Sequence, residues 1–146
     1  CAPIFIFDSD NRIICCLHSG WRGALSNIVK NCVKMLKKEK IKLNKVFAIV
    51  GPCLGYKNFE VNKNFKIQFI KKNKSYSKFF KTKNSNKDLF NLRGLINYQL
   101  KKEGIKNISN VNKDTYGNSH LFFSHRRATH NKKISTGRMI NIISFR

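Results

Sequence analysis

The sequence predicts a single α/β domain with a mixed sheet and flanking helices. Short apolar runs rich in β-branched and aromatic residues alternate along the chain with segments whose apolar residues recur at helical spacing. The 146 residues, of which 41% are hydrophobic, suffice to bury one core. We therefore expect strands and helices interleaved in one domain that spans residues 1–146.

The first predicted elements are two strands and a helix. Residues 2–7 and 12–17 are apolar, β-rich runs, and the turn signal Asp8-Ser9-Asp10-Asn11 between them indicates a hairpin or adjacent strands. From Ala24 to the lysines at 38–40, apolar side chains recur at helical spacing with other lysines opposite, which predicts an amphipathic helix.

The middle of the chain continues this alternation. A short apolar run at 46–50 predicts a strand that is followed by a loop beginning at Gly51-Pro52. A weaker helical pattern follows over 59–70. Residues 71–87 are rich in Lys, Ser and Asn, and we expect this segment to be the least ordered part of the protein unless Tyr76, Phe79 and Phe80 anchor it.

The last third of the chain predicts one more helix and further strands. Asp88 is a plausible N-cap for a helix that runs through Leu100, with Gly104 as its C-terminal stop. Strands are predicted at 105–111, 120–124 and 139–145.

The net charge of +23, from 30 basic and 7 acidic residues, attracts anions. A polyanion such as nucleic acid is the usual partner of so basic a chain. Here, however, the lysines are spread over 34–45, 57–87 and 101–113, as on solvated faces. We expect no primary role in nucleic-acid binding, whereas small phosphate-bearing substrates would still be attracted.

The five cysteines, at positions 1, 15, 16, 32 and 53, indicate reduced thiols. Their number is odd and they form no Cys-x-x-Cys pair, which favours a cytoplasmic protein over a disulfide framework. Cys15 and Cys16 are strand neighbours that face opposite sides, so we expect two buried apolar thiols rather than a joint ligand pair. No apolar run approaches the roughly 20 residues that span a bilayer, and we expect no contact with membranes.

The segment around His18 is the strongest candidate for a functional site. His18 ends a predicted strand, and Gly20 and Gly23 then bracket Trp21 and Arg22 where a helix begins. Strand ends that break into glycine turns before a helix are common ligand sites in α/β proteins. The alternative is an ordinary corner in which Trp21 packs and Arg22 stacks on it at the surface.

The residues themselves resemble a family signature. His18-Ser19-Gly20-Trp21-Arg22-Gly23 is similar to the His-Ala-Gly-Trp-Arg-Gly motif of the bacterial laccase-domain family, whose members are called YfiH-like polyphenol oxidase, multifunctional purine nucleoside phosphorylase and peptidoglycan editing factor. Other blocks of that family follow in order along nearly the whole chain. The segments of this chain that resemble them are Cys1-Ala2-Pro3, Gly51-Pro52-Cys53-Leu54-Gly55 with Phe59-Glu60-Val61, Asp114-Thr115-Tyr116, Phe122-Phe123-Ser124-His125-Arg126-Arg127 and Gly137-Arg138.

This resemblance implies a metal site at Cys1 and His18. In the family, these motif positions are two ligands of a catalytic zinc, and the third ligand is a histidine upstream of the cysteine. A Cys/His/His donor set suits zinc and leaves one position for water or substrate. The chain opens inside a motif and without Met, so we expect a C-terminal fragment whose own metal binding is weak or absent unless the upstream segment is restored.

The resemblance also suggests residues that bind the substrate. Arg22 is the main candidate for holding an anion, because guanidinium and backbone N–H groups converge at the helix start. Gly51 is expected in a tight loop near the substrate. Arg126 and Arg127 could bind phosphate bidentately, but as strand neighbours only one of them would face a pocket. The alternative for either arginine is a solvated basic edge. The catalytic set predicted is Cys1, His18 and Arg22.

The activity implied is that of a zinc-dependent purine nucleoside phosphorylase that also deaminates adenosine and phosphorolyses methylthioadenosine. Two other family activities compete: copper-dependent oxidation of polyphenols, and hydrolytic editing of peptidoglycan precursors. The sequence contains no His-x-His pair, which counts against a multicopper cluster. The alternatives outside these are a basic domain that associates with nucleic acid and an inactive remnant of the enzyme.

Overall fold

Four strands form the central sheet of the structure, a computed structural model that describes residues 1–145. They lie in the order β2 (Ile13–Ser19), β1 (Ala2–Asp8), β3 (Phe47–Val50) and β7 (Asn107–Asn110). β1 is antiparallel to both of its neighbours, whereas β3 and β7 are parallel. The mixed sheet and the N-terminal hairpin predicted from the sequence are confirmed.

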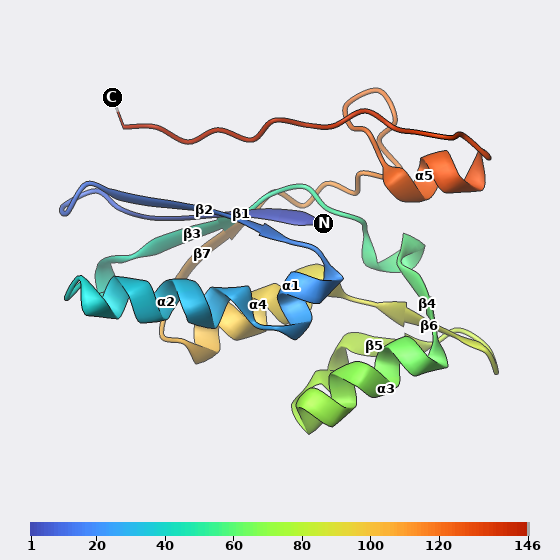
Figure 1. The fold of residues 1–146 in the computed structure, drawn as a ribbon, viewed down its shortest axis with the longest axis horizontal. Coiled ribbons are helices and arrows are strands. Elements are labelled where there is room, and N and C mark those ends of the chain that lie inside the picture. Colours follow the sequence, from blue (N-terminus) through green and yellow to red (C-terminus); the bar gives the residue numbers. More distant parts are fainter. Residues whose placement is uncertain (146) are drawn as a thin grey trace.

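Three helices cover one face of this sheet (Figure 1). They are α1 (Trp21–Leu25), α2 (Ile28–Lys38) and α4 (Leu92–Lys102). The prediction of one unbroken helix after Ala24 is wrong, because Asn27 takes a left-handed conformation with φ of 56° and divides α1 from α2. The Asn27 side chain then caps α2 by accepting from the Lys30 backbone N–H at 3.1 Å.

A second, three-stranded antiparallel sheet lies beside the helices, with strand order β4 (Glu60–Asn62), β6 (Lys87–Phe90) and β5 (Phe80–Thr82). Helix α3 (Lys63–Lys72) follows β4 directly, and the 3₁₀ helix η3 (Lys74–Phe79) leads into β5. The segment expected to be least ordered is therefore part of the fold. It is anchored by the buried side chains of Tyr76, Phe79 and Phe80.

A cluster of phenylalanine rings fills the space between α3 and the small sheet. The ring centroids of Phe69 and Phe90 are 4.9 Å apart, and those of Phe80 and Phe90 are 4.8 Å apart. Such pairs stabilise a fold by about 0.5–1.5 kcal/mol beyond the burial of their area. Shorter 3₁₀ turns connect the other elements at Leu43–Lys45 and Tyr56–Asn58.

The predicted N-cap of α4 is wrong, while its C-terminal stop is confirmed. Asn91 caps the helix by accepting from the Gly94 N–H at 2.8 Å. Asp88 lies instead in β6, fully buried, with its Oδ1 3.1 Å from Lys63 Nζ. Gly104 ends the helix with φ of 102°, a conformation that favours glycine.

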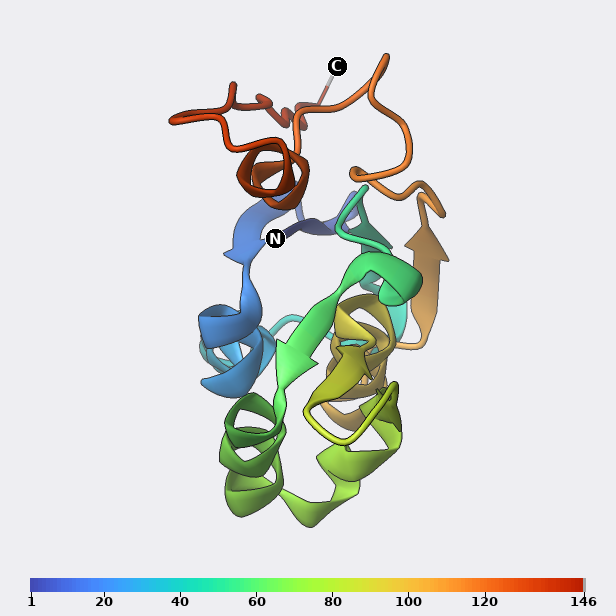
Figure 2. The ribbon, with the colours of Figure 1, turned by 90° about the vertical axis from the view of Figure 1, so that its right-hand side faces the viewer.

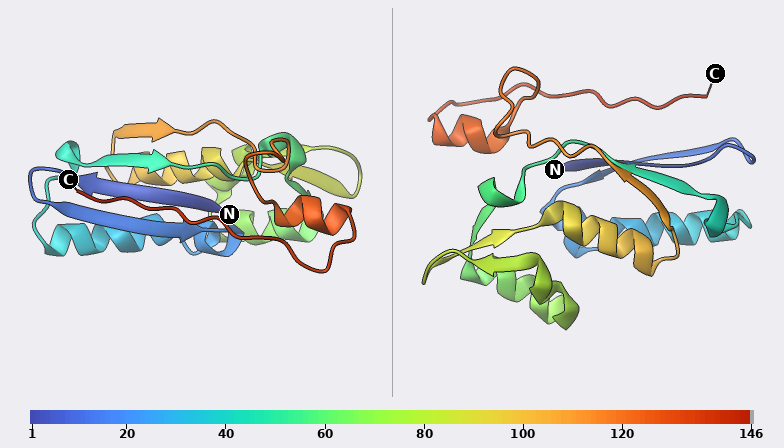
Figure 3. Two further views of the ribbon diagram at one scale, coloured as in Figure 1. Left: turned by 90° about the horizontal axis from the view of Figure 1, so that it is seen from above. Right: turned by 180° about the vertical axis from the view of Figure 1, so that it is seen from behind.

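The C-terminal third departs most from the sequence prediction. Residues 120–124 form the end of a turn and irregular backbone rather than a strand. Helix α5 (His125–His130) follows, capped by Ser124 Oγ, which accepts from the Arg127 N–H. Residues 139–145 run extended over the sheet face opposite the helices (Figures 1 and 3). Within the part of the chain that the structure describes, they pair with no strand, so the strand predicted there is not formed.

The cysteines of the hairpin differ from their prediction. All five thiols are free, Cys16 is exposed, and Cys15 is half-buried and hydrogen-bonded to the buried Cys32 of α2. No helix in the described part of the chain has the length and apolarity needed to cross a bilayer.

Candidate metal and substrate site

Cys1 and His18 lie side by side at one end of the hairpin. The register pairs Pro3 with His18 and Ala2 with Ser19, which places Cys1 next to Gly20. Cys1 Sγ is 3.0 Å, and His18 Nε2 3.9 Å, from the position that a Cβ atom would occupy on Gly20. The thiol and the imidazole therefore face the same small space, and both side chains are exposed.

Gly20 has no side chain, and this leaves the space that the Cys1 thiol and the His18 imidazole share. Its φ of −76° and ψ of −175° are ordinary extended values, so any constraint on a side chain here comes from close approach rather than from backbone strain. The Gly20 carbonyl accepts the first α1 hydrogen bond, from the Ala24 N–H at 2.9 Å. Gly20 thus lies at the strand end, beside the Cys1–His18 pair and at the start of the helix.

The donor chemistry of this pair fits zinc, which binds cysteine thiolate and histidine nitrogen. Over residues 1–145, no three side chains of His, Cys, Asp or Glu are grouped so that they could hold a metal ion. Cys1 and His18 by themselves would therefore leave a zinc site short of ligands among the described residues.

Arg22 lies on the exposed side of α1. Its guanidinium carbon is 4.4 Å from the centroid of the Trp21 ring, the stacking geometry of a cation–π pair. Arg22 also lines a shallow hollow of about 480 Å³ together with Lys71 and Lys72 of α3. The three positive charges make this hollow suitable for a small anion.

Arg126 and Arg127 lie on α5, not on a strand as predicted. Arg127 donates to the backbone carbonyls of Thr115 and Tyr116, at 2.6 and 2.7 Å, and to that of Phe122. It holds the loop before α5 in place. Arg126 donates to the Glu60 carbonyl at 3.0 Å, and its guanidinium lies 5.7 Å from the centroid of the Phe59 ring.

Gly51 is buried against the first strand. A Cβ atom there would lie 2.5 Å from Pro3 Cγ, and the Gly51 N–H donates to the Pro3 carbonyl at 2.9 Å. The structure gives Gly51 a packing role against Pro3. Asp114 organises the neighbouring loop by accepting from the Gly55 and Tyr116 backbone N–H groups, at 2.8 and 2.9 Å.

A second hollow of about 480 Å³ opens beside Trp21, and its walls include Phe59 and Phe65. Arg126 and His130 of α5 complete it on the polar side. His130 was not predicted as a site residue, because residues 120–124 were expected to form a strand. In helix α5, residues four positions apart lie on the same face, so His130 lies on the face that carries Arg126.

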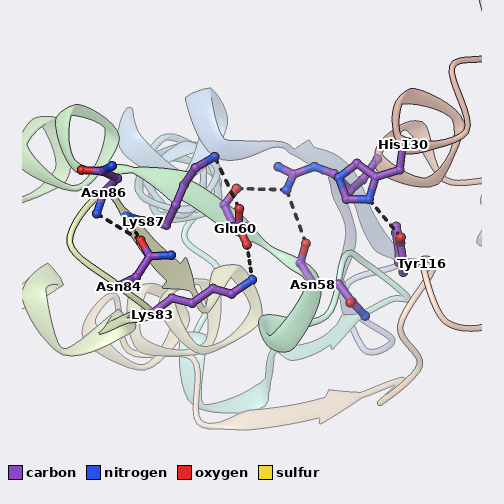
Figure 4. A network of polar contacts seen from close by, with 9 residues as sticks. Asn58, Glu60, Lys83, Asn84, Asn86, Lys87, Tyr116 and His130 are labelled. Atoms are coloured by element: carbon purple, nitrogen blue, oxygen red, sulfur yellow. Dashed lines mark hydrogen bonds and ion pairs between the residues drawn. The ribbon is translucent and has the colours of Figure 1, made fainter.

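Polar contacts surround this second hollow (Figure 4). Glu60 forms ion pairs with Lys83 and Lys87, and the hydrogen bond from the Lys83 ammonium lowers the pKa of the Glu60 carboxyl. His130 Nδ1 lies 2.9 Å from the hydroxyl of Tyr116. The carboxylate and the imidazole are thus both held in place by neighbours.

The chain is similar to proteins of a known family. Residues 1–146 match the family described as multi-copper polyphenol oxidoreductase laccase. The chain is 32% identical over 132 residues to the purine nucleoside phosphorylase RP494 of Rickettsia prowazekii, covering 89% of this chain and 54% of that protein. It is 30% identical over 131 residues to the purine nucleoside phosphorylase RC0672 of Rickettsia conorii, with the same coverage.

Solved structures share the fold. The hypothetical protein YfiH of Bacillus licheniformis superimposes with a TM-score of 0.82 at 25% identity, over 88% of this chain and 50% of that one. The protein NMB0706 of Neisseria meningitidis gives a TM-score of 0.80 at 26% identity, over 87% and 51%. The chain spans about half the length of the relatives it matches. It belongs to the laccase-domain family of YfiH-like proteins, described as multi-copper polyphenol oxidoreductase laccase.

Proposed function

We propose that the chain carries the active-site end of a zinc-dependent purine nucleoside phosphorylase, which also deaminates adenosine and phosphorolyses methylthioadenosine. The observation that carries this proposal is the approach of Cys1 Sγ and His18 Nε2 to one point beside Gly20. The names of the Rickettsia relatives support the substrate class.

The proposed roles follow from the positions of the side chains. Cys1 and His18 would hold the metal. Zinc bound there would polarise a substrate oxygen and lower the pKa of bound water toward about 7. Arg22, together with Lys71 and Lys72, would bind the phosphate that attacks the nucleoside. Arg126 would face the substrate from α5, whereas the three carbonyl contacts of Arg127 favour support of the loop.

Copper-dependent oxidation of phenols is the second candidate function, because the matching family is described by it. Thiolate and imidazole donors also bind copper. Peptidoglycan editing is a further alternative, and nucleic-acid association is one that a binding measurement would detect. The free cysteines are consistent with a reducing compartment, and we propose a cytoplasmic location.

The test is a metal and activity assay on matched histidine variants. In the complete protein, we expect His18→Ala to lose bound metal and phosphorolysis of inosine together, whereas His120→Ala, in an exposed turn, leaves both unchanged. Phenol oxidation that depends on His18 without any phosphorolysis would favour the copper enzyme. Turnover of inosine that survives His18→Ala would contradict the proposed site.

The nucleic-acid alternative makes a different prediction. Binding through the lysines would weaken steeply as salt rises, because each phosphate contact releases a counterion. No binding to RNA or DNA at low salt would remove it.

A further inference from the structure

The hollow beside Trp21 has aromatic walls. Trp21 comes from α1 and Phe65 from α3, and their ring centroids are 5.3 Å apart. Phe59 lies 6.3 Å from Phe65 by the same measure. Aromatic walls suit a planar aromatic ligand, since every heterocyclic base has a face that can stack. The volume of about 480 Å³ is within the range of small-molecule sites.

Helix α5 adds a polar side to these walls. Arg126 and His130, four residues apart, both line the hollow. Tyr116 holds the imidazole of His130 by the contact at Nδ1, and the two rings meet edge to face with centroids 5.5 Å apart. Because Nδ1 is engaged by Tyr116, Nε2 is the ring nitrogen left to bond a ligand.

Along the chain, the hollow begins one residue beyond Gly20, beside which the proposed metal-binding pair lies. Trp21 directly follows Gly20, the residue beside which Cys1 and His18 meet. Figure 2 shows the N-terminus lying between α5 above and α1 below. A ligand whose ring lay in the hollow could therefore extend its other end toward the metal-binding pair.

We propose that this hollow binds the purine ring of the substrate, and that His130, held by Tyr116, forms a hydrogen bond with the ring edge. This inference rests on the proposed function and deepens it, because it assigns the place of the base and names a specificity residue. The edge of a purine carries both hydrogen-bond donors and acceptors, and a neutral imidazole can supply either from Nε2 according to its tautomer.

The test uses Trp21 as the reporter, since it is the only tryptophan in the sequence. Hypoxanthine and inosine are titrated into the protein while tryptophan emission is followed. Both are expected to quench Trp21, and His130→Ala should weaken binding about 3- to 10-fold, the loss of one hydrogen bond. His130→Gln should restore part of the affinity, and Tyr116→Phe should reduce it less than His130→Ala. The control is His125→Ala, on the same helix.

Equal affinity of wild type and His130→Ala for hypoxanthine would overturn the assignment, as would inosine turnover without any change in Trp21 emission. Neither result touches the proposed function, whose own test is the joint loss of metal and turnover in His18→Ala. Conversely, quenching that depends on His130 in a protein that does not phosphorolyse inosine would keep the base site and refute the phosphorylase.

Discussion

Replacing Gly20 by alanine should weaken metal binding while leaving the fold intact. The backbone at Gly20 is in an extended region open to any residue, so Gly20→Ala should fold and change the free energy of unfolding by no more than about 1 kcal/mol. The added methyl carbon, however, would lie 3.0 Å from Cys1 Sγ and 3.9 Å from His18 Nε2. It enters the space that a bound metal and its two ligands need.

The size of the effect follows from these distances. Non-bonded heavy atoms pack at about 3.5–4.0 Å, so the thiol must move by roughly 0.5 Å or more. Metal–ligand distances tolerate only about ±0.2 Å around 2.3 Å for sulfur and 2.0 Å for nitrogen. We therefore expect metal affinity to fall about 10- to 100-fold, the range caused by disturbing the support of a ligand.

The assay is a Co²⁺ titration that follows the thiolate-to-cobalt absorption, with thermal unfolding recorded in parallel. Gly117→Ala is the matched control, because its methyl would have only Asp114 Oδ2 nearby, at an ordinary 3.8 Å. If Gly20→Ala bound cobalt as tightly as Gly117→Ala and wild type, the metal would not lie between Cys1 and His18, and the reasoning would be refuted.

Three further substitutions test the packing and the thiol chemistry. The buried Ser19 hydroxyl finds no hydrogen-bond partner among the described residues. In urea titrations, Ser19→Ala should therefore leave the free energy of unfolding unchanged or raise it by about 1 kcal/mol. A fall in the free energy of unfolding of more than about 1 kcal/mol would show that the hydroxyl has a hydrogen-bond partner. Gln99 donates to the Ala24 carbonyl at 2.7 Å and to the Tyr76 hydroxyl at 3.2 Å, so Gln99→Ala should cost about 2–4 kcal/mol in the same measurement, and a cost below 1 kcal/mol would contradict the bridging role. The hydrogen bond with Cys32 lowers the pKa of Cys15 to about 7, so the alkylation rate of Cys15, followed by mass spectrometry, should rise through neutral pH. Cys32→Ala should move that rise to higher pH. An unshifted pH profile in Cys32→Ala would exclude the hydrogen bond.

The elements set by local signals were predictable from the sequence. The turn Asp8-Ser9-Asp10-Asn11 gave the hairpin because Asp8 accepts from the Asp10 N–H and the Asn11 amide, as such turns do. Gly104 ended α4 because only glycine readily takes its positive φ. In both cases the physical cause lies within a few residues of the effect.

The errors arose where contacts between distant segments decide the outcome. Asp88 looked like a helix cap, but β6 carries it inward to Lys63, which is 25 positions away. The aromatic run Leu121-Phe122-Phe123 suggested a strand, yet Ser124 caps a helix immediately after it and Arg127 binds the carbonyls of the preceding loop. Neither ion pairs nor carbonyl clamps of this kind leave a periodic pattern in the sequence.

The candidate site also contains some residues that the sequence predicted and others that it did not. Cys1 and His18 were proposed from the family motifs, since a cysteine at a strand end carries almost no signal of its own. Arg22 came from the same motif, and the structure adds Lys71 and Lys72 beside it. His130 was out of reach because its place beside Arg126 depends on a helix that the sequence did not predict.

The most direct test of the account is the coordination shell of zinc bound to the protein, measured by X-ray absorption. We predict one sulfur at about 2.3 Å and nitrogen or oxygen at about 2.0–2.1 Å, with the sulfur lost in Cys1→Ser. A shell of nitrogen and oxygen alone, or a sulfur that persists in Cys1→Ser, would show that Cys1 and His18 do not form the metal site.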